Sequence, residues 1–252
     1  MSEGFQLAQL GAAQFLLIGA VAFAGSILGG LAGYGTGLVL PIFLAPAVGV
    51  ANVVPVMAVA MILNNGSRVA AFWRDIQWPH ARRILVFGLP ACMAGAYGYT
   101  LLEARAVALL LGLFFIAVVP LRRFLARAGW TLGARGVAVA GAGFGFVNGA
   151  MTGAGLLLIS TLMAAGVQGA SLIATDAVVS VIMGLAKVAL FGGFARLDAQ
   201  LTGAGLLIGL CTAPGAFVAR WLLARIPLKV HTVLMEIVVL AGGAGFLWRA
   251  VA

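Results

Sequence analysis

Apolar residues run in long blocks along the chain, separated by short polar or glycine-rich stretches. The blocks cover residues 11–32, 37–48, 50–72, 83–102, 104–121, 136–151, 155–165, 170–192, 199–222 and 230–251. A straight helix needs about 20 apolar residues to cross the hydrocarbon core of a bilayer. Most of the blocks approach this length, whereas those at 37–48 and 155–165 are too short. The pattern predicts an all-α polytopic membrane protein in which two helices do not span the bilayer on their own.

The composition also places the chain in lipid. Hydrophobic residues make up 63% of the sequence and charged residues 8%, and the mean hydropathy is +1.16. Soluble domains are about 45–50% apolar and about 25% charged. At about 20 residues per crossing, the chain holds about eight to ten crossings and leaves no room for a soluble domain. We therefore expect a single multi-pass transmembrane domain over residues 1–252. The first basic residue is Arg68, so we expect no cleavable signal peptide.

The net charge of +9 does not point to nucleic acid. The basic residues gather between the apolar blocks, as in Arg82-Arg83 and Arg122-Arg123. Such clustering is typical of cytoplasmic loops under the positive-inside bias of membrane proteins. The charge therefore indicates how the chain is oriented in the membrane rather than a ligand that it binds.

Neither a metal site nor a cofactor is expected. Cys92 and Cys211 both lie inside apolar blocks and are predicted to be small buried hydrophobic residues. His80 and His231 lie in a loop or at a block end and form no metal-ligand spacing with cysteines or carboxylates. The sequence also lacks a Gly-x-Ser-x-Gly elbow, an HExxH motif and a P-loop. We therefore expect no enzyme activity and no ATP-driven transport.

The two short blocks each follow a glycine-rich break, which points to an internal duplication. Glycines recur four residues apart before both short blocks: Gly25, Gly29, Gly33 and Gly37 in the first half, and Gly141, Gly145, Gly149 and Gly153 in the second. Farther along, "RVAAF" (68–72) matches "KVALF" (187–191). The sequence therefore predicts two homologous halves, residues 11–121 and 136–251. Each half holds a glycine-broken hairpin or short helix followed by three transmembrane helices.

The number of crossings per half decides whether the two copies are parallel or inverted. If the broken unit is a hairpin, it adds zero or two crossings to the three long helices, and the copies have opposite orientations. If it crosses once, the copies are parallel. Residues 11–48 are too long for one unbent crossing, which favours the hairpin. Under inversion, the basic loops at 73–83, 122–135 and 223–229 all lie inside. Inverted repeats are typical of secondary transporters.

The breaks themselves predict an anion site. Irregular backbone at membrane depth persists only where protein or a water-filled cavity satisfies its polar groups. Gly35 and Gly37 in the first break, and Gly153 and Gly155 in the second, introduce short helices whose first N–H groups lack helical partners. Two such helix ends, positive in their dipoles, favour a small anion. The competing interpretation is close helix packing, which glycines four residues apart also permit.

Two cations lie within apolar blocks at matching places in the two halves. Arg68 follows "NNGS", and Lys187 occupies the equivalent position. Cations in hydrocarbon usually face a cavity or a partner, so both are candidates to attract an anion. Alternatively, each snorkels to the interface from near the end of its block. Asn64, Asn65 and Ser67 lie within a turn of Arg68 and are candidate hydrogen-bond donors, or else link neighbouring helices.

Two carboxylates also lie within apolar blocks. Asp176 stands in "IATDAVVS". An intramembrane carboxylate can carry the proton of a coupled transporter, or it can pair with Lys187 or Arg68, and pairing is the favoured interpretation. Glu236, in the last block, is expected to pair with a cation or to face the lumen.

Two long segments resemble a known family. "FAGSILGGLAGYGTGLVLPIFLAPAVGVANVVPVMAVAMILNNGSRVAAFWRDIQW" (23–78) resembles the opening repeat of the TauE/SafE sulfite-exporter family. "FGFVNGAMTGAGLLLISTLMAAGVQGASLIATDAVVSVIMGLAKVALF" (144–191) resembles its second copy. The resemblance covers about residues 11–250. The sequence departs from the family pattern at Tyr34 and Thr36, where a run of glycines is more common, and at Asp176, where a small or neutral residue is expected.

The resemblance implies a function. It implies a gradient-driven transporter of a small sulfur-containing anion, such as sulfite or an organosulfonate, that exports its substrate across the bacterial inner membrane by alternating access. The candidate substrate-binding residues are Gly35, Thr36, Gly37, Asn64, Asn65, Ser67, Arg68, Gly153, Gly155, Thr175 and Lys187. Asp176 is the candidate for coupling to protons. The expected partners are the anion and the lipid bilayer, and a homo-oligomer stays open. The competing hypotheses are an anion channel and a membrane scaffold that transports nothing.

Overall fold

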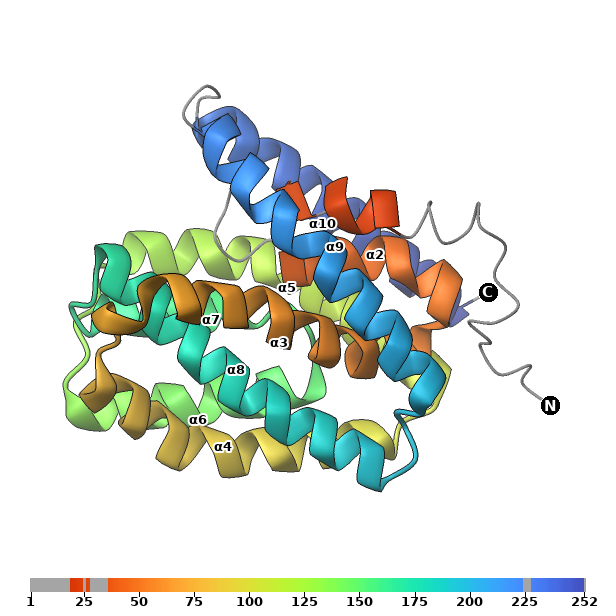
Figure 1. The fold of residues 1–252 in the computed structure, drawn as a ribbon, viewed down its shortest axis with the longest axis horizontal. Coiled ribbons are helices and arrows are strands. Elements are labelled where there is room, and N and C mark those ends of the chain that lie inside the picture. Colours follow the sequence, from red (N-terminus) through yellow and green to blue (C-terminus); the bar gives the residue numbers. More distant parts are fainter. Residues whose placement is uncertain (1–18, 25, 28–35, 224–227, 252) are drawn as a thin grey trace.

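The computed structural model describes residues 19–251 apart from residues 25, 28–35 and 224–227. This part of the chain is helical and contains no strand, as the sequence predicts. Residues 19–24 are helical, and the elements that follow are α2 (Thr36–Val48), η2 (Val50–Asn52), α3 (Val53–Phe72), η3 (Trp73–Asp75), α4 (Trp78–Thr100), α5 (Ala104–Ala128), α6 (Ala134–Ala150), α7 (Gly155–Ala164), α8 (Gly169–Gly193), α9 (Ala199–Leu223) and α10 (Leu228–Val251) (Figure 1).

The helices α2 and α7 are short, as the two short apolar blocks predict. They contain 13 and 10 residues, so at 1.5 Å per residue they are about 20 Å and about 15 Å long. Three segments in the described part of the chain are long and apolar enough to cross a membrane: Val50–Asp75, Ala104–Leu125 and Gly169–Gly193. The larger number of crossings expected from composition stays a prediction.

In the two predicted loops at 73–83 and 122–135, the basic residues lie on helices. Helix α4 begins at Trp78 and helix α5 continues to Ala128. The loops predicted at 73–83 and 122–135 therefore include residues that belong to helices, and the observed loops are shorter. Charged residues do not end a helix, because they form its hydrogen bonds as readily as apolar residues do. The apolar block ends at these positions, but the helix continues.

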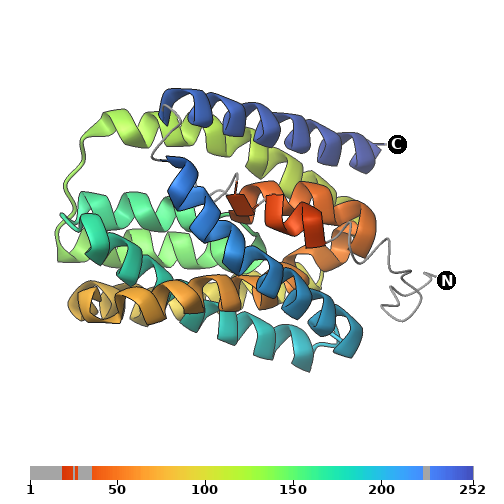
Figure 2. The same ribbon diagram turned by 45° about the horizontal axis from the view of Figure 1, so that its top comes forward.

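The helices form one bundle with two apolar clusters. Helix α3 packs against α8 and α9, α4 packs against α6 and α8, and α10 lies along α5 (Figure 2). One cluster joins α2, α3 and α5 to α9 and α10, and includes Leu44, Met57 and Phe115. The other lies among α4, α6, α7 and α8, and includes Cys92 and Leu158. Cys92 is buried, as predicted, whereas Cys211 is half-buried.

Glycines on α6 allow α4 to approach it closely. A Cβ atom at Gly145 would overlap the backbone of Gly88, and one at Gly149 would overlap the backbone of Cys92. The glycines on α6 therefore pack helices together, which was the competing interpretation of this series. Of the equivalent series in the first half, Gly25, Gly29 and Gly33 lie outside the described residues.

An ion-pair group joins α5 to α10. The Glu236 carboxylate is 2.5 Å from Nη2 of Arg123 and 3.6 Å from Nη1 of Arg122. Glu236 is buried, so the two arginines supply the opposite charge that a buried carboxylate requires. Of the two alternatives for Glu236, pairing is the one observed.

Candidate functional site

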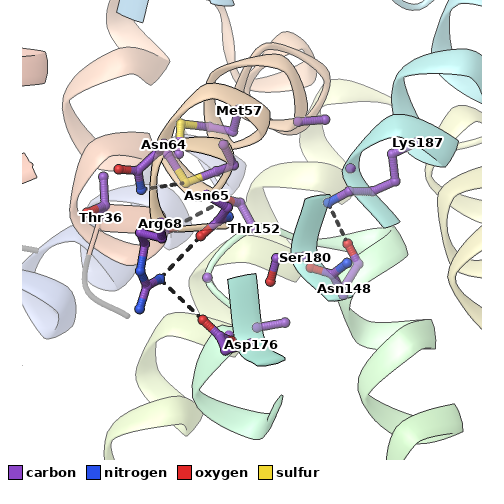
Figure 3. Close-up of a pocket in the computed structure, with 17 residues that line it drawn as sticks. Thr36, Met57, Asn64, Asn65, Arg68, Asn148, Thr152, Asp176, Ser180 and Lys187 are labelled. Carbon is purple, nitrogen blue, oxygen red and sulfur yellow. Dashed lines mark hydrogen bonds and ion pairs between the residues drawn. The ribbon is translucent and has the colours of Figure 1, made fainter. Parts of the chain in front are cut away.

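The two helix breaks meet at a cavity of about 80 Å³. The cavity lies where the first residues of α2 and α7 face α3, α8 and the end of α6 (Figure 3). Its lining residues are Thr36, Gly37, Met57, Ala58, Met61, Asn64, Asn65, Arg68, Asn148, Thr152, Gly153, Ala154, Gly155, Asp176, Ser180, Gly184 and Lys187. About 10–15 Å³ measured in this way holds one water molecule, so the cavity has room for a small polyatomic ion.

Direct contacts hold the two breaks together. The Thr152 hydroxyl donates a hydrogen bond to the carbonyl oxygen of Gly37 at 3.1 Å. A Cβ atom at Gly37 would lie 3.0 Å from Cα of Gly153, closer than side chains normally allow. Gly153 has a φ of +84°, which glycine adopts without strain. Gly153 thus allows the chain to turn, and Gly37 allows the two breaks to approach each other closely.

Both short helices begin at the cavity. Thr36 and Gly37 open α2, and Ala154 and Gly155 stand at the start of α7, where no side chain caps the first turn. The first N–H groups of a helix have no helical acceptors, and the helix dipole is positive there. The predicted arrangement of two helix starts near one site is present for these residues, while Gly35 lies outside the described part of the chain.

An ion pair occupies one end of the cavity. Nη1 of Arg68 lies 3.2 Å from Oδ2 of Asp176 and donates a second hydrogen bond to Oδ1 of Asn65, also at 3.2 Å. Asp176 is 4% exposed, and its Oδ1 atom is buried and has no hydrogen-bond partner in the described structure. The Arg68 side chain is 22% exposed. The Arg68 side chain therefore contacts the buried carboxylate while part of it stays exposed.

A lysine that forms no ion pair with any described acidic residue occupies the other end. Lys187 is 6% exposed, and its ammonium donates a hydrogen bond to the backbone oxygen of Asn148 at 2.9 Å. No Asp or Glu in the described residues forms an ion pair with it. Lys187 and Asp176 lie about 16 Å apart along the axis of α8, and Ser180 stands between them (Figure 3). Because Lys187 is buried among helices, it does not snorkel to the interface.

Two predicted residues do not line the cavity. The Ser67 hydroxyl donates a hydrogen bond to the backbone oxygen of Asn64 at 2.8 Å, within its own helix. The Thr175 hydroxyl accepts a hydrogen bond from the backbone N–H of Gln77 at 3.0 Å, at the link between η3 and α4. The Ser67 hydroxyl thus acts within its own helix, and the Thr175 hydroxyl links α8 to the segment that precedes α4. Asn64 does line the cavity, with its amide 3.9 Å from the sulfur of Met61.

Sequence reasoning missed several polar residues of the lining. Asn148 and Thr152 stand within the glycine-rich stretch before α7. Their position beside the second break could have predicted that they line the cavity. Ser180 lies one helical turn after Asp176 and therefore shares its face of α8. Met57 and Met61, one turn apart on α3, carried no signal beyond apolarity.

The charged lining residues make the cavity electropositive. At their ordinary protonation states, Arg68 and Lys187 contribute one positive charge each and Asp176 contributes one negative charge, and no other Arg, Lys, Asp or Glu lines the cavity in the described structure. Buried charges need an opposite charge or strong hydrogen bonds nearby. Asp176 supplies the opposite charge for one cation only, so the site lacks one negative charge. In the described residues, no cluster of His, Cys, Asp and Glu is arranged to hold a metal ion.

Comparison with known proteins assigns the chain to a family. A family model described as "Sulfite exporter TauE/SafE" matches residues 17–246, nearly the whole chain. No curated protein and no solved structure gives a significant match. The family is one of membrane transporters rather than enzymes, in agreement with the apolar helices of the bundle. The chain belongs to the TauE/SafE family of sulfite exporters.

Proposed function

We propose that the protein is a secondary transporter that moves a small sulfur-containing anion, such as sulfite or an organosulfonate, out across the bacterial inner membrane. The observation that carries the proposal is the buried ammonium of Lys187, which lines a polar cavity and has no acidic partner in the described residues. An isolated charge in a medium of low polarity is strongly unfavourable. A bound anion would supply the missing opposite charge.

The cavity offers hydrogen-bond donors for an oxyanion in addition to charge. Gly37 and Gly155 line the cavity at the starts of α2 and α7, where the first backbone N–H groups have no helical acceptors. Asn64, Asn65 and the hydroxyl of Ser180 line the same space. Sulfite and sulfonate groups carry three oxygens, which several donors from different directions suit. In this proposal, Lys187 and the helix starts bind the anion, and the partly exposed Arg68 attracts it.

The packing of the helices supports inverted repeats. If the halves match as predicted, α3 corresponds to α8, α4 to α9, and α5 to α10. Helix α3 packs against α8, and the contact of α3 with α9 has its counterpart in the contact of α4 with α8. Along α3, Arg68 lies beside Asp176 and Ala58 lies near Gly184, so α3 and α8 are antiparallel. Equivalent helices that run in opposite directions are expected of inverted copies.

In such transporters the two halves rock around a central site between broken helices, and each movement exposes the site to one side of the membrane. The cavity lies where the two breaks meet, which is the location that this mechanism requires. The absence of an ATP-binding motif in the sequence favours a gradient as the driving force. Asp176, a buried carboxylate paired with Arg68, is the proposed carrier of a coupled proton.

The test is sulfite counterflow in proteoliposomes. We expect saturable uptake of labelled sulfite against internal unlabelled sulfite, which a channel does not produce. Lys187→Met removes the charge at similar volume, and we expect uptake to fall at least about tenfold, because hydrogen bonds to charged groups contribute about 1.5–3 kcal/mol. Lys187→Arg keeps the charge and should retain part of the activity. Arg249→Gln removes an exposed cation outside the cavity and serves as the control.

Two results would refute the proposal. Uptake without counterflow would indicate a channel. If Lys187→Met transports sulfite at the rate of the unaltered protein, the buried ammonium does not bind the anion.

A further inference from the structure

The charges that line the cavity point to the charge of its ligand. In the part of the chain that the structure describes, the cavity wall contains two basic residues, Arg68 and Lys187, and one acidic residue, Asp176. One cation is therefore balanced within the protein and one is not. The helix starts at Gly37 and Gly155 add hydrogen-bond donors and dipoles but no net charge. A ligand with one negative charge would make the side chains and ligand neutral together, whereas a ligand with two would leave an excess negative charge.

The placement of Asp176 makes that excess unfavourable. Asp176 is 4% exposed, so little water screens its charge. Its Oδ2 atom contacts Arg68, while its Oδ1 atom is buried and has no hydrogen-bond partner in the described structure. A carboxylate with one oxygen left unpaired keeps part of its negative potential. A second negative charge on an anion in the same cavity would be repelled by it.

We infer that Asp176 determines charge selectivity: the site takes singly charged sulfur oxyanions, such as hydrogen sulfite and simple alkylsulfonates, and rejects doubly charged ones such as sulfate. The inference rests on the proposed function, because it describes the ligand of the same cavity. Sulfate and methanesulfonate are both tetrahedral at sulfur and similar in size. They differ by one negative charge and by a methyl group in place of one oxygen, and only the charge difference should depend on the charge of Asp176. Asp176 is the only acidic residue of the lining in the described structure.

The experiment measures binding and transport separately. The dissociation constants of methanesulfonate and of sulfate are measured by isothermal titration calorimetry on the purified protein in detergent, and sulfite counterflow is measured in proteoliposomes. The variants are Asp176→Asn, which removes the charge and keeps the shape, and Asp75→Asn, the same change at a carboxylate of η3 that does not line the cavity.

We expect the unaltered protein and Asp75→Asn to bind methanesulfonate at least about tenfold more tightly than sulfate. In Asp176→Asn, the ratio of the two dissociation constants should shift in favour of sulfate by about tenfold or more. The reason is that the carboxylate no longer repels the second negative charge of sulfate. Because the ratio is taken within one variant, a general loss of folded protein does not change it.

The outcomes separate the two proposals. Equal binding of sulfate and methanesulfonate by the unaltered protein, or an unchanged ratio in Asp176→Asn, overturns the role of Asp176 and leaves transport intact. The expected ratios without any counterflow confirm charge selectivity and refute the transport mechanism. Binding of neither anion overturns the charge selectivity, and the absence of sulfite counterflow as well overturns both proposals.

Discussion

The hydroxyl of Thr152 donates a hydrogen bond to the backbone oxygen of Gly37 at 3.1 Å, although the two residues are 115 positions apart in the sequence. Gly37 belongs to the first turn of α2, and Thr152 precedes α7. This bond therefore links the two helix breaks directly. It satisfies a backbone carbonyl at the cavity wall, which a bilayer would not do.

Removing this hydrogen bond should loosen the contact between the breaks. Thr152→Val replaces the hydroxyl with a methyl group and leaves the Gly37 carbonyl without this donor. We expect a loss of about 1–3 kcal/mol in stability, seen as a lower melting temperature in detergent, and slower sulfite counterflow. Thr152→Ser keeps the hydroxyl and should behave like the unaltered protein in both measurements. Equal effects of the valine and serine variants would contradict a role for the hydrogen bond.

The glycine series on α6 should tolerate substitution at some positions and not at others. A Cβ atom at Gly145 would overlap the backbone of Gly88, whereas one at Gly143 has no atom within 4 Å. We expect Gly145→Ala to lose about 1–3 kcal/mol through overpacking. Gly143→Ala should be neutral or slightly stabilising, because alanine favours the helix.

Thermal unfolding in detergent compares the two alanine variants on one helix. A melting temperature of Gly145→Ala equal to that of Gly143→Ala would show that α4 and α6 do not pack in this way.

The Arg68–Asp176 pair should show strong coupling between its two members. Arg68→Met leaves Asp176 buried without its cation. Removing one partner of a buried ion pair destabilises a protein by about 3–5 kcal/mol, and we expect a smaller loss here because Arg68 is partly exposed. Arg68→Met combined with Asp176→Asn removes both charges, and we expect it to be more stable than Arg68→Met alone. A double-mutant cycle on melting temperatures measures the coupling. Additive effects of the two substitutions would exclude a direct interaction.

The topology predicts which positions share one side of the membrane. Helix α8 is a candidate span, and Gln168 and Gly193 stand at its two ends. The backbone N–H of Gln77 bonds to Thr175 near the start of α8, so Asp75 lies at the same end of the bundle as Gln168. Asp75→Cys and Gln168→Cys should react with a membrane-impermeant maleimide from one side, and Gly193→Cys from the other.

The labelling requires a protein without native cysteines, obtained with Cys92→Ala and Cys211→Ala. Intact and inverted vesicles give the two sides. Labelling of all three positions from the same side would show that α8 does not cross the membrane.

Much of the architecture follows from the order of residues alone. Hydrophobic blocks and helix-forming composition are local properties, so the helices, the two short helices and the glycine-rich breaks before them were predictable. The cations Arg68 and Lys187 also stood out, because a charge inside an apolar block is unusual wherever the chain folds.

The tertiary structure decided which of these residues meet. Whether Ser67 or Asn64 faces the cavity depends on the rotation of α3 against its neighbours, which the local sequence does not specify. The pairing of Arg68 with Asp176 joins residues 108 positions apart. That Lys187 has no acidic partner among the described residues depends on all the helices around it. The same holds for the glycines before α7. Gly145 and Gly149 pack against α4 and Gly153 turns the chain, although their spacing in the sequence is identical.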